Sequence, residues 1–284
     1  MKKCTTVYAR MALLVVVLLF FGVPNAQAVT QGVVTENILG RNLLVYVPSV
    51  LPVEGHRSLV IVLHGGMGNA QRIESERSES ALKLDAYAEK HGFVVAYLNG
   101  TPVTHFLGHD KLGWNAGGGC CGQSAENDVD DVGYITGVID HFVTAYGVDR
   151  NRVYGIGHSN GAMMTQRMVC EAGVYAAAVS VSGPLNLDID QCPAAQGKRV
   201  LAIHGVDDAN VPMVGGQGTK GLSKAVFKSE EHSRQVYARS GASYSLDAVK
   251  RADHRLDHID DMLRQSEGVS LGEKAVQFFG LDKP

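Results

Sequence analysis

Short runs of consecutive apolar residues alternate along the chain with stretches in which apolar residues recur at helical spacing. Continuous apolar runs are typical of strands that are buried on both faces of a sheet. We therefore predict an α/β fold with a mostly parallel central sheet and helices on both faces. The predicted strands lie at 42–47, 59–63, 93–98, 152–156, 176–181, 200–203 and 244–249, and the predicted helices at 80–91, 131–146, 160–170, 230–240 and 271–279.

The beginning of the chain has a different pattern. Three basic residues within the first ten precede an apolar stretch at 11–23, and Ala26-Gln27-Ala28 follows it. This order predicts a secretory signal peptide at 1–28, and hence a secreted or periplasmic protein. An uncleaved membrane anchor is disfavoured, because the apolar stretch is too short to cross a bilayer comfortably. The length of 29–284 suits a single domain.

Charge and composition exclude some partners. The formal net charge is −3 and no basic tract occurs, so we expect no nucleic-acid partner. The acidic segment Asn127-Asp128-Val129-Asp130-Asp131 lacks the spacing of a known calcium loop. We interpret it as the acidic start of the helix at 131–146, where the helix dipole favours negative charge. We therefore expect no metal site and no cofactor.

Four of the five cysteines follow the predicted signal peptide. An even number in an exported chain indicates two disulfides. Cys170 ends the predicted helix at 160–170 and Cys192 lies in the loop after the next strand, so we expect these two to be bridged. Cys120 and Cys121 then form a bridge between neighbours or stay free. No histidine lies near them at the spacing of a zinc site.

A GxSxG pentapeptide, Gly157-His158-Ser159-Asn160-Gly161, joins the strand predicted at 152–156 to the helix predicted at 160–170. A serine in this setting lies on a sharp turn, the nucleophile elbow, which lifts its hydroxyl clear of the backbone. The flanking glycines are needed because larger side chains would collide in so tight a turn. We predict that Ser159 is a nucleophile and not part of an ordinary strand-to-helix loop.

A serine nucleophile needs a base, and the base needs an orienting acid. In α/β-hydrolases the acid follows the serine and the histidine comes last. Asp208, just after the strand at 200–203, is the predicted acid, with Asp207 as the alternative. His254 comes soonest after the last strand and is the predicted base. His258, about one turn further on, is its alternative.

The oxyanion of an ester-hydrolysis intermediate needs preorganised N–H donors. Asn160, the residue after the nucleophile, supplies one predicted donor at a helix N-terminus. The segment His64-Gly65-Gly66-Met67-Gly68 directly follows the strand at 59–63 and should supply the other. We expect this donor to be the Gly66 N–H, with Met67 as the alternative.

Five segments between about residues 44 and 211 carry a resemblance to a known family. They are His64-Gly65-Gly66, Gly113-Trp114-Asn115-Ala116-Gly117-Gly118-Gly119-Cys120-Cys121-Gly122, Val129-Asp130-Asp131-Val132-Gly133, 157–164 and 204–212. On these segments the chain resembles the secreted polyhydroxybutyrate depolymerase and feruloyl esterase family of α/β-hydrolases. The resemblance implies the α/β-hydrolase fold and marks Ser159 and Asp208 as catalytic.

The resemblance has a further implication and one gap. It places the Trp114 loop beside the cleft, where the indole could bind substrate by stacking on an aromatic or sugar group. On position alone, Trp114 could equally anchor its loop to the core. The family's histidine often lies in Gly-Gly-Gly-His-x-Trp-Pro-Gly, whereas this chain has Arg251-Ala252-Asp253-His254-Arg255-Leu256. The missing tryptophan and proline suggest a reshaped substrate wall.

These observations together predict an exported serine esterase that works through an acyl-enzyme. Its expected partner is an ester substrate, which can be polymeric, and it should have no stable membrane anchor after signal cleavage. Polyhydroxyalkanoates, feruloyl or acetyl esters of polysaccharides, and small aryl esters all remain open. A non-catalytic binding or surface protein on a hydrolase scaffold, or a serine peptidase or lipase, are the alternatives.

Overall fold

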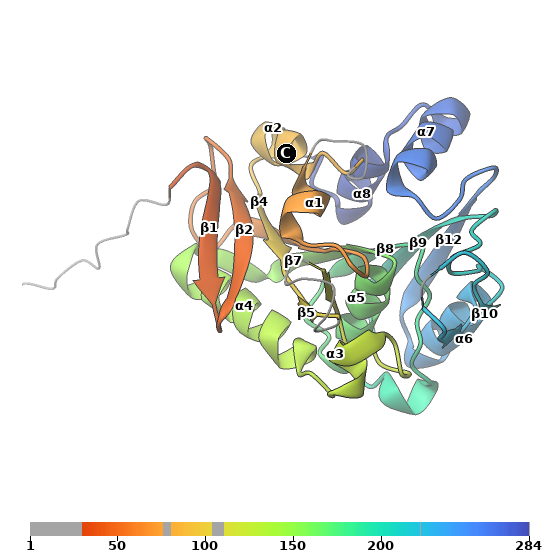
Figure 1. Cartoon of the computed structure of the whole chain (residues 1–284). Helices are drawn as coiled ribbons and strands as arrows, with labels where there is room; N and C mark the ends of the chain where they lie inside the picture. The colour runs from red at the N-terminus through yellow and green to blue at the C-terminus, as the bar shows by residue number, and fades with distance from the viewer. Residues whose placement is uncertain (1–29, 76–80, 104–110, 222, 284) are drawn as a thin grey trace, which may run out of the picture.

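The computed structural model describes residues 30–75, 81–103, 111–221 and 223–283, and eight strands of this part form one sheet (Figure 1). β2 is antiparallel to both of its neighbours, and every pairing from β4 to β12 is parallel. Across the sheet the order is β1 (Gly32–Ile38), β2 (Arg41–Val47), β4 (Val94–Leu98), β3 (Arg57–Leu63), β7 (Val148–His158), β8 (Ala177–Val181), β9 (Arg199–Gly205) and β12 (Ser243–Val249).

Helices cover both faces of the sheet, and short strands pair outside it. The helices are α1 (Ala70–Glu74), α2 (Leu84–His91), α3 (Gly122–Glu126), α4 (Asp131–Ala145), α5 (Asn160–Glu171), α6 (Glu230–Ser240), α7 (Leu256–Glu267) and α8 (Leu271–Phe279), with a 3-10 turn, η1, at Ile189–Gln191. The short pairs are β5 (Thr101–Pro102) with β6 (Leu112–Gly113) and β10 (Gly216–Gln217) with β11 (Val226–Phe227).

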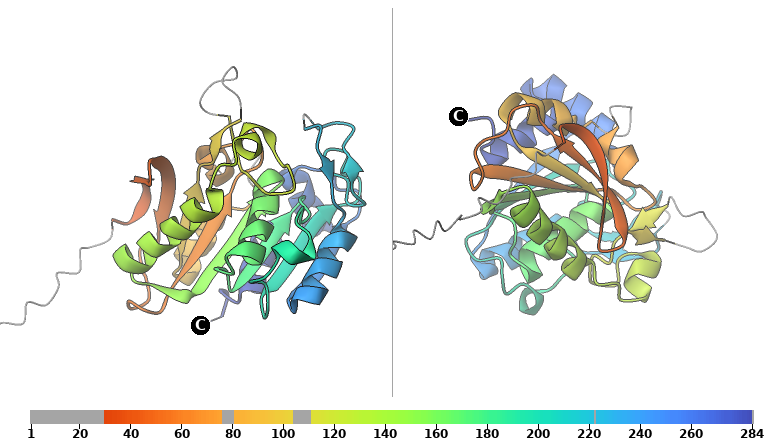
Figure 2. Two further views of the ribbon diagram at one scale, coloured as in Figure 1. Left: turned by 90° about the horizontal axis from the view of Figure 1, so that it is seen from below. Right: turned by 90° about the vertical axis from the view of Figure 1, so that its left-hand side faces the viewer.

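Two apolar cores form because successive side chains of a strand point to opposite faces. In β3, Leu59, Ile61 and Leu63 join the core under α4, α5 and α6. Val60 and Val62 join the core on the other face, under α2, α7 and α8. Both groups of helices are visible on either side of the sheet in Figures 1 and 2. The predicted α/β-hydrolase fold is confirmed by this layered arrangement.

Two of the differences from the predicted secondary structure have a local cause. β1 was not predicted, because Thr35, Glu36 and Asn37 interrupt its apolar positions, and its residues alternate between exposed and half-buried at the sheet edge. The helix expected at 80–91 begins only at Leu84, because Lys83 adopts a left-handed conformation with a φ of 45°. Both deviations lie away from the strand ends that carry the predicted site.

The structure pairs all four cysteines that follow residue 28. Cys170, at the end of α5, is bonded to Cys192, which follows η1. Cys120 is bonded to Cys121 in the loop that precedes α3. The signal peptide expected at 1–28 lies outside the described residues. Within the described ranges, none of the helices has the length and apolar character needed to cross a membrane.

Candidate active site

Ser159 lies on the turn between β7 and α5, in a strained backbone conformation with φ 55° and ψ −120°. The turn is tight: a Cβ atom added at Gly157 would lie 2.2 Å from the carbonyl oxygen of Gly161. A Cβ at Gly161 would lie 2.3 Å from the carbonyl oxygen of Leu63 in β3. The glycines therefore allow the turn to close against β3, which leaves Ser159 partly exposed at the carboxyl edge of the sheet.

Three side chains from separate loops form a continuous hydrogen-bonded line. The Nε2 atom of His254 lies 2.9 Å from the Oγ of Ser159, and its Nδ1 atom lies 2.7 Å from the Oδ2 of Asp208. Asp208 is buried in the turn after β9, and its Oδ1 accepts hydrogen bonds from the backbone N–H groups of Asn210 and Val211. This arrangement can remove a proton from Ser159 and stabilise the imidazolium that results.

The two alternative residues lie elsewhere. Asp207 is exposed to solvent, next to the buried Asp208. The Nδ1 atom of His258 lies 3.1 Å from the Oδ1 of Asp253, and the backbone N–H of Asp253 donates to the same nitrogen. His258 is therefore held at the start of α7, whereas His254 faces Ser159.

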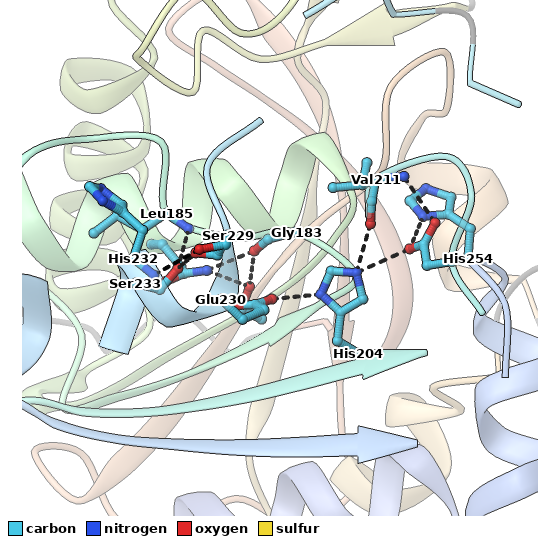
Figure 3. A network of polar contacts seen from close by, with 12 residues as sticks. Gly183, Leu185, His204, Val211, Ser229, Glu230, His232, Ser233 and His254 are labelled. Carbon is cyan, nitrogen blue, oxygen red and sulfur yellow. Dashed lines mark hydrogen bonds and ion pairs between the residues drawn. The ribbon is translucent and has the colours of Figure 1, made fainter. Parts of the chain in front are cut away.

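A second histidine lies behind Asp208 (Figure 3). The Nε2 atom of His204, on β9, is 3.2 Å from the Oδ2 of Asp208, and its Nδ1 atom is 2.6 Å from the Oε1 of Glu230 on α6. Burial by itself lowers the pKa of His204, but its hydrogen bonds to the two carboxylates raise it to about 10. For Asp208 burial alone would raise the pKa, but His204 and His254 hold it well below its ordinary value.

The two predicted oxyanion donors are the backbone N–H groups of Gly66 and Asn160. In the described part of the chain, neither the N–H of Gly66 nor that of Asn160 donates to a protein oxygen. The two residues are neighbours, since a Cβ atom at Gly66 would lie 3.7 Å from the Cβ of Asn160. The N–H of Met67, the alternative donor, is already bonded to the carbonyl oxygen of Leu112 at 2.7 Å.

Trp114 does not line the cleft, so the prediction that it binds substrate is wrong. Its side chain is fully buried, and its indole N–H donates to the carbonyl oxygen of His64. Its backbone N–H and C=O are both bonded to the side chain of Asn160. Trp114 thus anchors the two segments that carry the predicted oxyanion donors. The sequence motif marks the tryptophan, but only packing decides which way it faces.

His158, the residue before Ser159, packs against His254. Its Nε2 atom lies 2.8 Å from the backbone oxygen of His254, and the two rings are 5.0 Å apart. Burial and the nearby His254 lower the pKa of His158 to about 3. His158 is therefore neutral near pH 7 and donates this hydrogen bond, which fixes the backbone that carries His254.

The hydrogen-bonded group of Ser159, His254 and Asp208 adjoins a cleft of about 990 Å³. Ser159, His254 and Gly66 lie in its wall. Apolar side chains complete it, together with charged groups at the rim: Ile73, Val103, Met163, Val211, Phe227 and Leu256, with Arg72, Glu126, Lys224, Arg255 and Asp257. The cleft can hold an ester with an apolar acyl group and a polar, bulky alcohol.

The acidic segment near α4 has a structural role. The side chain of Asp130 accepts a hydrogen bond from the backbone N–H of Gly133 and caps the helix. Asp131 pairs with Arg41 and accepts from the backbone of Asn115. Among the described residues, no group of three or more His, Cys, Asp or Glu side chains is placed to hold a metal ion.

Comparison with protein families shows to which family the chain belongs. Residues 50–259 match the family described as phospholipase/carboxylesterase. The chain belongs to this family. It is 31% identical over 190 residues to feruloyl esterase B of Piromyces equi, a match that covers 66% of this chain and 32% of that protein. The chain spans less than half the length of the curated relatives that it matches.

Solved structures share the fold of this carboxylesterase-family chain. The acetyl xylan esterase of Aspergillus awamori aligns with a TM-score of 0.55 and 15% identity, covering 88% of this chain and 98% of that one. The carboxylesterase of Bacillus cereus aligns with a TM-score of 0.56 and 17% identity, covering 85% and 94%. At these identities the likeness concerns the fold alone.

Sequence reasoning missed His204, Glu230 and the positioning contact of His158 in this carboxylesterase-family chain. His204 stands four residues before Asp208, at the end of a buried strand, and this is the one signal that could have drawn attention to it. Glu230 lies 26 residues further on at the start of α6, where an acidic residue is expected from the helix dipole alone. Its contact with His204 depends on how α6 packs on the sheet.

Proposed function

We propose that this chain is an exported serine carboxylesterase in which Ser159, His254 and Asp208 are the catalytic residues. The observation that carries the proposal is the hydrogen-bonded line from Asp208 through His254 to Ser159, which opens onto a cleft beside two free N–H donors. Membership of the phospholipase/carboxylesterase family supports the same reaction class.

In the proposed reaction, the Oγ of Ser159 attacks the ester carbonyl while Nε2 of His254 takes the hydroxyl proton. The N–H groups of Gly66 and Asn160 donate to the resulting oxyanion, where fixed donors are worth most. Collapse of the intermediate breaks the bond to the alcohol, which leaves with the proton from His254. Water then attacks the acyl carbonyl while Nε2 of His254 takes one of its protons; the bond to Oγ breaks, His254 returns the proton to Ser159, and the carboxylic acid is released.

We assign the natural substrate to esters of aromatic acids on polysaccharides, represented by feruloyl esters. Two observations support this class: a relative named feruloyl esterase B at 31% identity, and a cleft with apolar walls and a charged rim. The apolar walls suit an aromatic acyl group, and the open rim suits a sugar chain. Polyhydroxyalkanoate and acetyl esters are the competing substrates.

The catalytic assignment is tested with Ser159→Ala on a short p-nitrophenyl ester. We expect kcat/KM to fall by roughly three orders of magnitude or more, because no nucleophile remains. A fluorophosphonate probe should label the wild type and leave the variant unlabelled. Equal hydrolysis rates in the two proteins would exclude this mechanism.

The substrate assignment is tested by comparing initial rates on a feruloyl arabinoxylan oligosaccharide, an acetylated xylan and a polyhydroxybutyrate film, with product analysis for each. The highest kcat/KM is expected for the feruloyl ester. A higher value for either of the other two would replace it as the substrate class. This result would leave the Ser159 mechanism untouched.

Export of the protein rests on the sequence pattern of residues 1–28. The pairing of all four later cysteines supports it, since disulfides persist in oxidising compartments. Expression of the full chain in a bacterium followed by N-terminal sequencing of the exported protein should give a chain that begins at Val29. A cytoplasmic protein that begins at Met1 would contradict the proposal.

A further inference from the structure

We infer that His204 and Glu230 form a buried charged pair that positions Asp208 without cancelling its negative charge, which makes His204 a positioning residue for the reaction. The inference rests on the proposed function, because it assigns a task within the same site. The side chains of His204, Glu230 and Asp208 are each 0 or 1% exposed, so no water screens their charges. Figure 3 shows how the network runs from α6 through β9 to His254.

Both ring nitrogens of His204 face acceptors. Nδ1 is 2.6 Å from the Oε1 of Glu230, whereas Nε2 is 2.8 Å from the backbone oxygen of Val211 and 3.2 Å from the Oδ2 of Asp208. A neutral imidazole has one N–H and one lone pair, so one of its nitrogens would face an oxygen lone pair at hydrogen-bond distance. While both carboxylates are ionised, only the doubly protonated ring satisfies both sides, and His204 is therefore an imidazolium near neutral pH.

This imidazolium places a positive charge next to the three hydrogen-bond donors around Asp208. The Oδ1 atom accepts from the N–H groups of Asn210 and Val211, while the Oδ2 atom lies between His204 and His254. With three donors and a neighbouring cation in fixed positions, the carboxylate can neither rotate nor take up a proton easily. The Oδ2 atom is consequently held where it meets the Nδ1 of His254.

Glu230 has the complementary task. A lone cation beside Asp208 would cancel the negative charge that stabilises His254 when it is protonated during the reaction. Glu230 neutralises His204 from the opposite side, and a hydrogen bond of 2.5 Å from the hydroxyl of Tyr244 on β12 fixes its second oxygen. The pair therefore orients Asp208 without removing its field from His254.

The other titratable groups around this network contribute no competing charge near neutral pH. Burial raises the pKa of Tyr244 and Tyr237 far above the ordinary value, so both phenols stay neutral. His158 on β7 stays neutral because its pKa is lowered to about 3. Of the residues that flank His254 along the chain, Arg255 pairs with Asp257, and Asp253 lies beside His258.

The test is a charge cycle that compares His204→Gln, Glu230→Gln and the double variant, with the acid limb of the pH profile of kcat/KM as the readout. His204→Gln removes a cation, so His254 is protonated more readily and the acid limb moves to higher pH by about one unit. Glu230→Gln leaves the cation unbalanced and moves the limb to lower pH. The double variant removes one charge of each sign and returns the limb close to its wild-type position.

Tyr244→Phe is the matched control. It removes a hydrogen bond from Glu230 without a change in charge, so the acid limb should stay in place. If the contact between α6 and β9 had only a structural role, all variants would be less stable and the acid limb of the pH profile would not move. An unchanged limb in His204→Gln, or a shift that the second substitution does not reverse, would overturn the inference.

A second measurement does not depend on the folding of any variant. In wild-type protein labelled with ¹⁵N-histidine, the assigned ring of His204 should show protons on both nitrogens at pH 8. A spectrum of a neutral tautomer at that pH would also overturn the inference. Failure of the proposed function is distinguishable, because it appears as full activity of Ser159→Ala and leaves the state of the His204 ring unaffected.

Discussion

At the scale of single residues, neighbours in sequence have opposite environments. Asp207 and Asp208 both follow β9, yet Asp207 is exposed and Asp208 is buried among three hydrogen-bond donors and the ring of His204. Chain order identifies the turn that carries an acid, but cannot separate two adjacent carboxylates. The direction of each side chain depends on how the turn packs against the loop after β12.

The two late histidines provide the corresponding test of the base. We expect His254→Ala to lower kcat/KM for a p-nitrophenyl ester by roughly three orders of magnitude or more, because Ser159 then has no proton acceptor. His258→Ala serves as the control and should stay within about twofold of wild type, because His258 contacts Asp253 and not Ser159. Loss of activity in the His258 variant alone would transfer the role of the base to that residue.

At the scale of elements, the site depends on close contacts between backbones. The turn from β7 to α5 fits because two glycines leave room for β3 and for the first turn of the helix. The side chain of Asn160 ties this turn to the backbone of Trp114 through two hydrogen bonds. The geometry of the nucleophile is therefore set jointly by three segments that are far apart in the sequence.

Gly161→Ala tests this packing. The added Cβ atom would lie 2.3 Å from the carbonyl oxygen of Leu63 and 2.4 Å from that of His64, so backbone must move. We expect the free energy of unfolding to fall by about 3 kcal/mol and kcat/KM to fall with it. Denaturant titration and ester hydrolysis measure the two effects.

Gly268→Ala provides the control for the Gly161 variant. Gly268 ends α7 with a φ of 75°, and an added Cβ would meet no atom within 4 Å. Only backbone strain opposes this substitution, so a loss of about 1 kcal/mol with unchanged kcat/KM is expected. Similar losses of stability in both variants would contradict the proposed role of the close contact with β3.

At the scale of the whole molecule, the parallel sheet gathers the site. β3, β7, β9 and β12 end at the same edge, as shown by pairings such as Leu63 with Gly157 and Gly205 with Val249. The segments that follow these strands carry Gly66, Ser159, Asp208 and His254. Residues separated by nearly 200 positions meet because ligand sites in open parallel sheets form beyond the carboxyl ends of the strands.

The Cys170–Cys192 bridge acts at this same scale, because it links the end of α5 to the segment between β8 and β9. It closes a loop of 22 residues, so the chain-entropy relation gives a stabilisation of about 3 kcal/mol. We expect Cys170→Ala combined with Cys192→Ala to lower the free energy of unfolding by this amount in a denaturant titration. Activity at 25 °C should be retained, since Cys170 lies near the opposite end of α5 from Ser159.

The single variant Cys192→Ala checks the origin of that effect, because it breaks the same bridge and should lose about the same stability. If the double variant had the same unfolding midpoint as the wild type, the bridge would contribute nothing to stability.

The sequence by itself determined seven strands of the sheet, five of the helices, the turn around Ser159 and the segments that hold an acid and a histidine. These features follow from local periodicity and from the steric needs of one turn, both of which are properties of neighbouring residues. It also marked Trp114, but assigned it to the cleft instead of the core.

Tertiary structure alone decided that Trp114 is buried, that His254 and not His258 faces Ser159, and that His204 and Glu230 stand behind Asp208. The physical reason is that the direction and ionisation of a side chain depend on the groups packed around it. Those groups come from strands and helices that the sequence does not place next to one another.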